Sequence, residues 1–363
     1  MKRSLEVWLP ILLLASAAPA VAQDAKTPFE RGFQSRAAAA CEQRLAANPR
    51  DAEAGAILSR ITSNRGDVNR ALELAQAAAA ADPKNADAQY ALSEIYGRKA
   101  QRSSVLNQPG LAGKMRKAAD ACLAIDPNHV DALEILVDFH RFAPGFMGGD
   151  KKKAAEFSDR IVRVEPVAGW IKKAETAQDS KDSTEAGECY RKAAAVSPDP
   201  GASSSGAHGR ALVAYASWLT PRWRDPAAAE KLALAAVQAE PWRTGGWSVL
   251  AGLYARESRW SDLELVLKQS ETAEPSHLAP WYHAARQLVV EGREPARAEG
   301  YLRHYLSREP EIGAPSAAFA RWRLGLALEA QGKRNEAVAE MNAALKLDPK
   351  LEDAKKDLKR LRG

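Results

Sequence analysis

The 363-residue chain is 46% hydrophobic and 27% charged, a composition that excludes an intrinsically disordered protein. Its 52 basic and 46 acidic residues give a net charge of +6, a mild excess that favours an acidic partner or an anionic surface. Alanine-rich stretches such as 37–40 and 77–81 favour helix, and no long segment alternates with the period of two that strands require. The composition therefore predicts an all-α protein.

The first 22 residues have the features of a secretory signal. Lys2 and Arg3 precede an apolar run at 7–14, and an A-x-A cleavage pattern stands at 20–22. The apolar run is short for a membrane span of ~20 residues, although an uncleaved anchor is the alternative. We expect residues 1–22 to be removed, leaving a periplasmic bacterial protein with no membrane span and no nucleic-acid partner.

Prolines recur at nearly regular intervals, each after an alanine-rich apolar run. Two of the intervals, Pro49 to Pro83 and Pro241 to Pro275, are both 34 residues, and the others lie near that length. The residue before a proline avoids the α region, so each proline is expected to end a helix and to separate repeated units. The full set is Pro49, Pro83, Pro127, Pro166, Pro198, Pro241, Pro275, Pro310 and Pro349.

Two of these units carry a recognisable residue pattern. One has Trp247, Leu250, Ala251 and Tyr254, and the other has Leu324, Gly325, Leu328, Ala337, Met341 and Ala344. The spacing resembles that of tetratricopeptide-repeat (TPR) proteins, and with degenerate copies the resemblance covers about residues 28–349. It implies a right-handed solenoid of about eight helical hairpins.

The resemblance also predicts how the chain is divided. Residues 23–49 form an N-terminal half repeat, with one long helix over 29–47. Residues 50–349 form the repeat array, and 350–363 form a capping helix with an apolar face and a basic face. Membrane-surface binding is the alternative role for that basic amphipathic helix.

The family's groove positions can be transferred to this chain. They predict a mixed-charge groove suited to an extended peptide or a helix, whereas Trp247 and Trp281 fall on positions used for packing. The predicted groove residues are Tyr90, Glu94, Arg98, Glu134, Asp138, Arg141, Tyr282, Arg286, Trp322 and Glu329.

Three insertions stand out, at 101–110, 143–150 and 220–225, and the last two supply the candidate loop residues. Residues 143–150 resemble an APG-x-x-GG element of exported bacterial TPR proteins, with Asp150 placed to cap the next helix. The loop lacks P-loop spacing, so a structural turn and a ligand loop both stay open. The candidate loop residues are Pro144, Gly145, Gly148 and Gly149, with Arg222 and Trp223 in the other insertion.

Catalytic signatures such as H-E-x-x-H, C-x2-C and G-x-S-x-G are absent from the sequence. Cys41, Cys122 and Cys189 fall in alternate units, which predicts three free, buried thiols. We therefore expect a non-catalytic scaffold or adaptor, without cofactor or metal, that binds a protein or peptide. The alternatives are a protein that binds an envelope polymer, peptidoglycan or an anionic polysaccharide, through the Trp- and Arg-rich second half, and an enzyme with an unrecognised site.

Overall fold

The computed structural model describes residues 24–196, 205–220 and 224–363, and within these ranges every regular element is a helix. Two helices come first, α1 (Lys26–Glu30) and α2 (Gln34–Ala47). Eight hairpins follow: α3 (Ala52–Asn64) with α4 (Val68–Ala81), α5 (Ala86–Arg102) with α6 (Gln108–Ile125), α7 (Val130–Phe142) with α8 (Lys151–Val164), α9 (Pro166–Asp179) with α10 (Ser183–Ala195), α11 (Ser205–Leu219) with α12 (Pro226–Ala239), α13 (Thr244–Arg256) with α14 (Trp260–Ala273), α15 (Ala279–Glu291) with α16 (Pro295–Tyr305), and α17 (Ala317–Glu329) with α18 (Arg334–Leu347). The last helix is α19 (Glu352–Arg362). The predicted signal segment and the loop residues Arg222 and Trp223 lie outside the described residues.

Each hairpin begins and ends where the local sequence requires it. Side chains such as Asp51, Asn85 and Asp182 cap the first turns by accepting backbone N–H groups. Most second helices end immediately before an X-Pro step. Helix α4, for example, ends at Ala81, and the next residue, Asp82, has an extended backbone and precedes Pro83. Two second helices end earlier, α10 at Ala195 before Pro198 and α16 at Tyr305 before Pro310.

Small residues set the distance between the two helices of a hairpin. A Cβ at Gly325 would lie 2.9 Å from the Met341 side chain and 3.1 Å from the carbonyl oxygen of Ala337. Both residues are fully buried, as is Ala344. The sequence pattern that predicted this close approach therefore describes the hairpin core.

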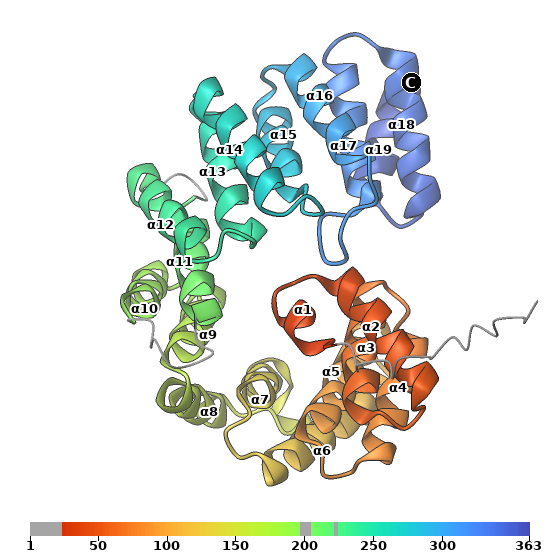
Figure 1. Cartoon of the computed structure of the whole chain (residues 1–363), viewed down its shortest axis with the longest axis vertical. Coiled ribbons are helices and arrows are strands. Elements are labelled where there is room, and N and C mark those ends of the chain that lie inside the picture. The colour runs from red at the N-terminus through yellow and green to blue at the C-terminus, as the bar shows by residue number, and fades with distance from the viewer. Residues whose placement is uncertain (1–23, 197–204, 221–223) are drawn as a thin grey trace, which may run out of the picture.

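The hairpins stack so that the odd-numbered helices form the inner surface. Helix α3 packs on α5, α5 on α7, and α9 through α17 pack in series, while the even-numbered helices cover the outside (Figure 1). At the C-terminal end α19 buries Leu358 and Leu361 against the last units. Cys41, Cys122 and Cys189 are buried and free, as predicted. Among the described residues no helix has the length and apolar character needed to cross a membrane.

The N-terminal segment differs from its prediction. In place of one helix over 29–47, the chain breaks at 31–33 and forms α1 and α2. Gly32 stands at this break with φ +90°, a left-handed conformation that glycine adopts without strain. The break turns α1 back toward the inner surface of the solenoid.

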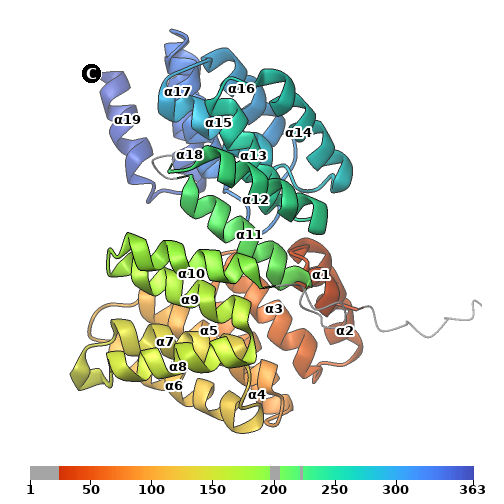
Figure 2. The same ribbon diagram turned by 90° about the vertical axis from the view of Figure 1, so that its left-hand side faces the viewer.

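The solenoid closes on itself through these first helices (Figures 1 and 2). The Arg36 guanidinium lies 2.7 Å from the Glu274 carboxylate, and the Ser35 N–H donates to Glu311 at 2.8 Å. The rings of Phe33 and His277 are 5.2 Å apart. We call these contacts between α2 and the turns of the C-terminal half the seam.

Candidate binding grooves

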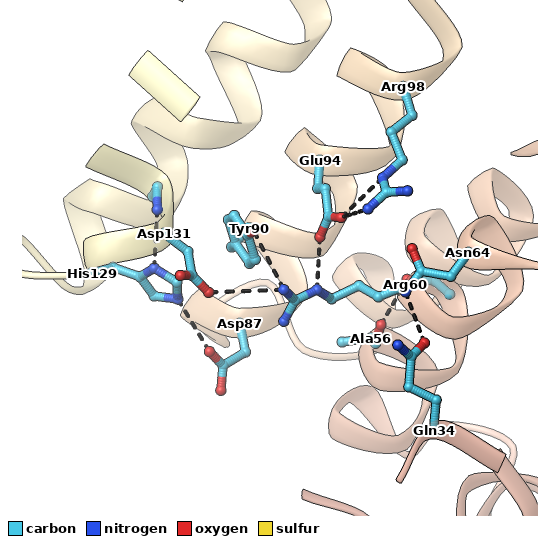
Figure 3. A network of polar contacts seen from close by, with 12 residues as sticks. Gln34, Ala56, Arg60, Asn64, Asp87, Tyr90, Glu94, Arg98, His129 and Asp131 are labelled. Atoms are coloured by element: carbon cyan, nitrogen blue, oxygen red, sulfur yellow. Dashed lines mark hydrogen bonds and ion pairs between the residues drawn. The ribbon is translucent and has the colours of Figure 1, made fainter. Parts of the chain in front are cut away.

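Arg60 organises the inner surface of the first units (Figure 3). Its guanidinium, carried on α3, lies 2.7 Å from the Glu94 carboxylate and 4.8 Å from the centre of the Tyr90 ring, both on α5. Asp131 of α7 approaches to 3.9 Å, and Arg98 binds Glu94 from the other side at 2.7 Å. The predicted groove residues Tyr90, Glu94 and Arg98 are therefore brought together.

The charges of this cluster compensate one another. Burial alone would raise the pKa of Glu94, but Arg60 and Arg98 hold that pKa below its ordinary value. Sequence reasoning missed Arg60, although the residue stands 34 positions before Glu94 and thus at the equivalent place in the preceding unit. A search one repeat period away from each predicted acid would have found it.

The repeat period also relates the charged residues of the next two inner helices, α7 and α9. Asp138 of α7 binds Lys172 of α9 at 2.8 Å, again across 34 residues, and Lys172 is only 7% exposed. Arg141 of α7 pairs with Asp138 at 3.5 Å and also with Asp179 of α9. The predicted residues Asp138 and Arg141 thus join neighbouring units.

Among the predicted acidic groove residues, Glu134 is the one whose charge is least compensated. Burial, reinforced by Asp131, Glu175 and Asp138 and opposed by Lys172, raises the pKa of Glu134 from 4.5 to about 7. The folded state therefore binds more protons than the unfolded chain between these values, so Glu134 makes stability fall as pH rises from 4.5 to 7.

We expect the substitution Glu134→Gln to remove this dependence of stability on pH. The variant should be more stable than the native chain above pH 7, by about 2 kcal/mol, and should lose the advantage near pH 4. Urea unfolding at pH 4 and pH 8 measures the difference. Glu188→Gln, which removes an exposed carboxylate, should have the stability of the native protein at both pH values. An equal response of the two variants would contradict the burial of the Glu134 charge.

In the C-terminal half, three predicted groove residues make contacts within the fold. The Trp322 indole N–H donates to Asp357 of α19 at 2.9 Å, and Glu329 pairs with Arg360 of the same helix. The Tyr282 hydroxyl accepts from Arg323 at 3.1 Å. The capping helix α19 therefore covers the positions that a following repeat would cover.

Arg286 lies in an open groove. A cavity of about 650 Å³ runs along α11, α13 and α15, and the Arg286 side chain is exposed in it. The neighbouring surface of α13 is small and polar at Thr244, Ser248 and Gly252, which follow one another at one-turn spacing. Among the described residues that line this groove, Arg286 is the one charged side chain that is permanently ionised.

The groove is electrostatically suited to an anion. Burial, together with Arg286 and Arg323, lowers the pKa of His283 from 6.5 to about 4, so this lining residue is neutral at pH 7. No carboxylate occurs among the described lining residues, and Arg286 makes no hydrogen bond or ion pair with the described part of the chain. We call this cavity the Arg286 groove.

The Gly-rich loop at 143–150 is held by its own backbone. Gly149 N–H donates to the Pro144 carbonyl at 3.1 Å and Asp150 N–H to the His140 carbonyl at 2.9 Å. The Asp150 carboxylate caps α8 as predicted, and the His140 ring bonds the Gly148 carbonyl at 3.0 Å. Because these bonds occupy the backbone groups of the turn, they favour the structural interpretation of Pro144, Gly145, Gly148 and Gly149.

Comparisons with known proteins found one family model and similar solved structures. The family model described as tetratricopeptide repeat matches residues 167–200 and 320–351. Among solved structures, a tetratricopeptide repeat protein from Parabacteroides merdae is 14% identical, over 75% of this chain and 99% of that chain, with a TM-score of 0.45. Yeast Tom70 is 14% identical, over 93% of this chain and 86% of that chain, with a TM-score of 0.48. No curated protein matches this sequence.

The chain is thus a helical solenoid in which two segments match the tetratricopeptide-repeat model, and the predicted all-α hairpin fold is confirmed. Such a fold supports a scaffold for protein interactions, because stacked hairpins expose an extended inner surface.

Proposed function

We propose that this protein is a non-catalytic adaptor of the bacterial cell envelope that holds a peptide or a partner protein on the inner surface of its solenoid. The observation that carries the proposal is the Arg286 groove, which Thr244, Ser248 and Gly252 line on the α13 side and in which Arg286 is the one permanent cation among the described lining residues. An extended backbone fits against Ser248 and Gly252, and Arg286 binds a carboxylate of the partner, either a side chain or a chain terminus.

The substitution Arg286→Glu tests this proposal. It reverses the single permanent charge of the groove, so we expect at least tenfold weaker retention of the partner. The measurement is a pull-down from bacterial envelope extract, with the retained proteins quantified by mass spectrometry. Arg50→Glu, at an exposed site in the turn between α2 and α3, makes the same charge change away from the groove and should retain the partner.

Two outcomes would contradict the proposal. Equal retention by the native chain and Arg286→Glu would remove the groove from partner binding. Retention of glycan fragments without an enriched protein would favour the envelope-polymer alternative.

The described tryptophans give that alternative little support. Polymer sugars bind on open aromatic faces, yet each tryptophan of known exposure in the described part of the chain is buried or half-buried. Trp247, for example, donates its indole N–H to the Pro241 carbonyl at 2.8 Å, and Trp281 packs on His304 with ring centres 4.1 Å apart. These rings serve packing, as predicted for Trp247 and Trp281.

A further inference from the structure

The helix α1 lies on the inner side of the first units (Figure 1), and its Phe29 contacts Arg60. The Phe29 ring sits 4.9 Å from the Arg60 guanidinium, which is thus flanked by Phe29 from α1 and Tyr90 from α5. Phe29 also packs on the apolar cluster that contains Ile57 and Ile61. A segment from outside the repeats therefore supplies an aromatic ring to the inner surface.

The basic residue of α1 meets the acidic part of that surface. Lys26 lies one helical turn before Phe29, and its ammonium group is 3.6 Å from the Asp87 carboxylate of α5. Asp87 is held in place by His129, whose Nδ1 accepts the Ala132 N–H at 3.3 Å and whose Nε2–H donates to Asp87 at 3.1 Å (Figure 3).

A cavity of about 320 Å³ lies between α1 and the repeats, beside these contacts. The repeats contribute four carboxylates to it, against the guanidinium of Arg60 and the imidazole of His129, so the described lining carries an excess of negative charge whether or not His129 is protonated. The carboxylates that they contribute are Glu53, Asp87, Asp126 and Asp131. Lys26 offsets part of this charge, while the Asp131 side chain stays 49% exposed.

From these contacts we infer that α1 is a built-in ligand of this groove, and that the groove accepts in trans a peptide with a basic residue followed three positions later by an aromatic residue. The inference rests on the proposed function and names a partner chemistry for this second groove. The basic side chain binds the carboxylates around Asp87, and the aromatic ring stacks on Arg60. The attached α1 competes with the incoming peptide, so the groove is autoinhibited.

The competition is large enough to measure. A segment tethered this closely has an effective concentration of about 1 mM, so an α1 sequence with an intrinsic Kd of ~100 µM weakens an incoming peptide roughly tenfold. Substituting Lys26 and Phe29 in α1 should therefore tighten peptide binding by about the same factor. Both side chains are incompletely buried and α1 lies outside the repeats, so the solenoid should keep its fold.

The test uses the full chain and a fluorescein-labelled peptide with the sequence of residues 24–33. Fluorescence anisotropy should show at least tenfold tighter binding to Lys26→Glu/Phe29→Ala than to the native chain. A control peptide carrying the same two changes should bind neither chain. Adding Asp87→Asn, which keeps an acceptor for His129 but removes the charge, should weaken the peptide again.

The outcomes separate this inference from the proposed function. The inference is overturned if the folded Lys26→Glu/Phe29→Ala chain does not bind the peptide, or if it binds both peptides with equal affinity. If Arg286-dependent partner retention survives in that chain, the adaptor function stands without the built-in ligand. If both activities are missing while circular dichroism shows native helix content, the proposed function fails as well.

Discussion

Replacing Gly149 with alanine should destabilise the unit formed by α7 and α8 by about 3 kcal/mol or more. A Cβ at this position would stand 1.7 Å from the Ala143 carbonyl oxygen and 2.6 Å from its carbonyl carbon. Neither is the end of a flexible side chain, so the backbone of the turn must move. That movement breaks the bond from Gly149 N–H to the Pro144 carbonyl and shifts the Asp150 cap of α8. Urea unfolding followed by circular dichroism measures the loss.

Gly145→Ala is the matched control within the same loop. A Cβ at Gly145 would meet nothing within 4 Å, and this residue lies in the short 3-10 helix at 145–147. Its stability should stay within about 0.5 kcal/mol of the native chain. Equal stability of the two variants would show that the loop relaxes freely, and would reopen the ligand-loop interpretation of the APG-x-x-GG element.

The hairpin architecture could be predicted because its signals are local. Prolines such as Pro83 and Pro275 end helices through their own stereochemistry. Gly325 predicts a close helix contact, because a residue without a side chain leaves room for the helix packed against it. Contacts between neighbouring units follow from the repeat period as well. Arg60 and Lys172 stand 34 positions from Glu94 and Asp138, so periodicity places each pair together even in degenerate units.

The closure of the solenoid could not be predicted from these signals. Its curvature is the sum of small rotations between units, and degenerate repeats do not specify those rotations individually. The seam joins residues far apart in sequence, such as Arg36 with Glu274 and Ser35 with Glu311. The fold of α1 against Arg60 was missed because Gly32 breaks the segment 29–47, for which one continuous helix was predicted.

The double substitution Phe33→Ala/Arg36→Ala should open the ring. Phe33 is 7% exposed and lies between the His277 ring and the Arg36 guanidinium, which is 4.5 Å from the Phe33 ring centre. Removing a buried phenylalanine costs about 3–5 kcal/mol, part of it at the seam, and the second change removes the Arg36–Glu274 ion pair. Glu274 keeps its bond from Ser276 at 2.8 Å, so the turn after α14 stays formed.

Small-angle X-ray scattering should therefore report a larger radius of gyration and maximum dimension for this variant, with unchanged helix content. Phe146→Ala/Arg70→Ala removes the same atoms at exposed sites, since Phe146 is 88% exposed and Arg70 pairs only on the surface, and it should scatter like the native chain. If both variants scatter like the native chain, the remaining contacts of α1 and α2, such as Ser35 with Glu311 and Arg243 with the Glu30 carbonyl, are sufficient to hold the ring. If the seam variant opens, access to the Arg286 groove and to the cavity beside α1 depends on an equilibrium that a partner binding at the seam would shift.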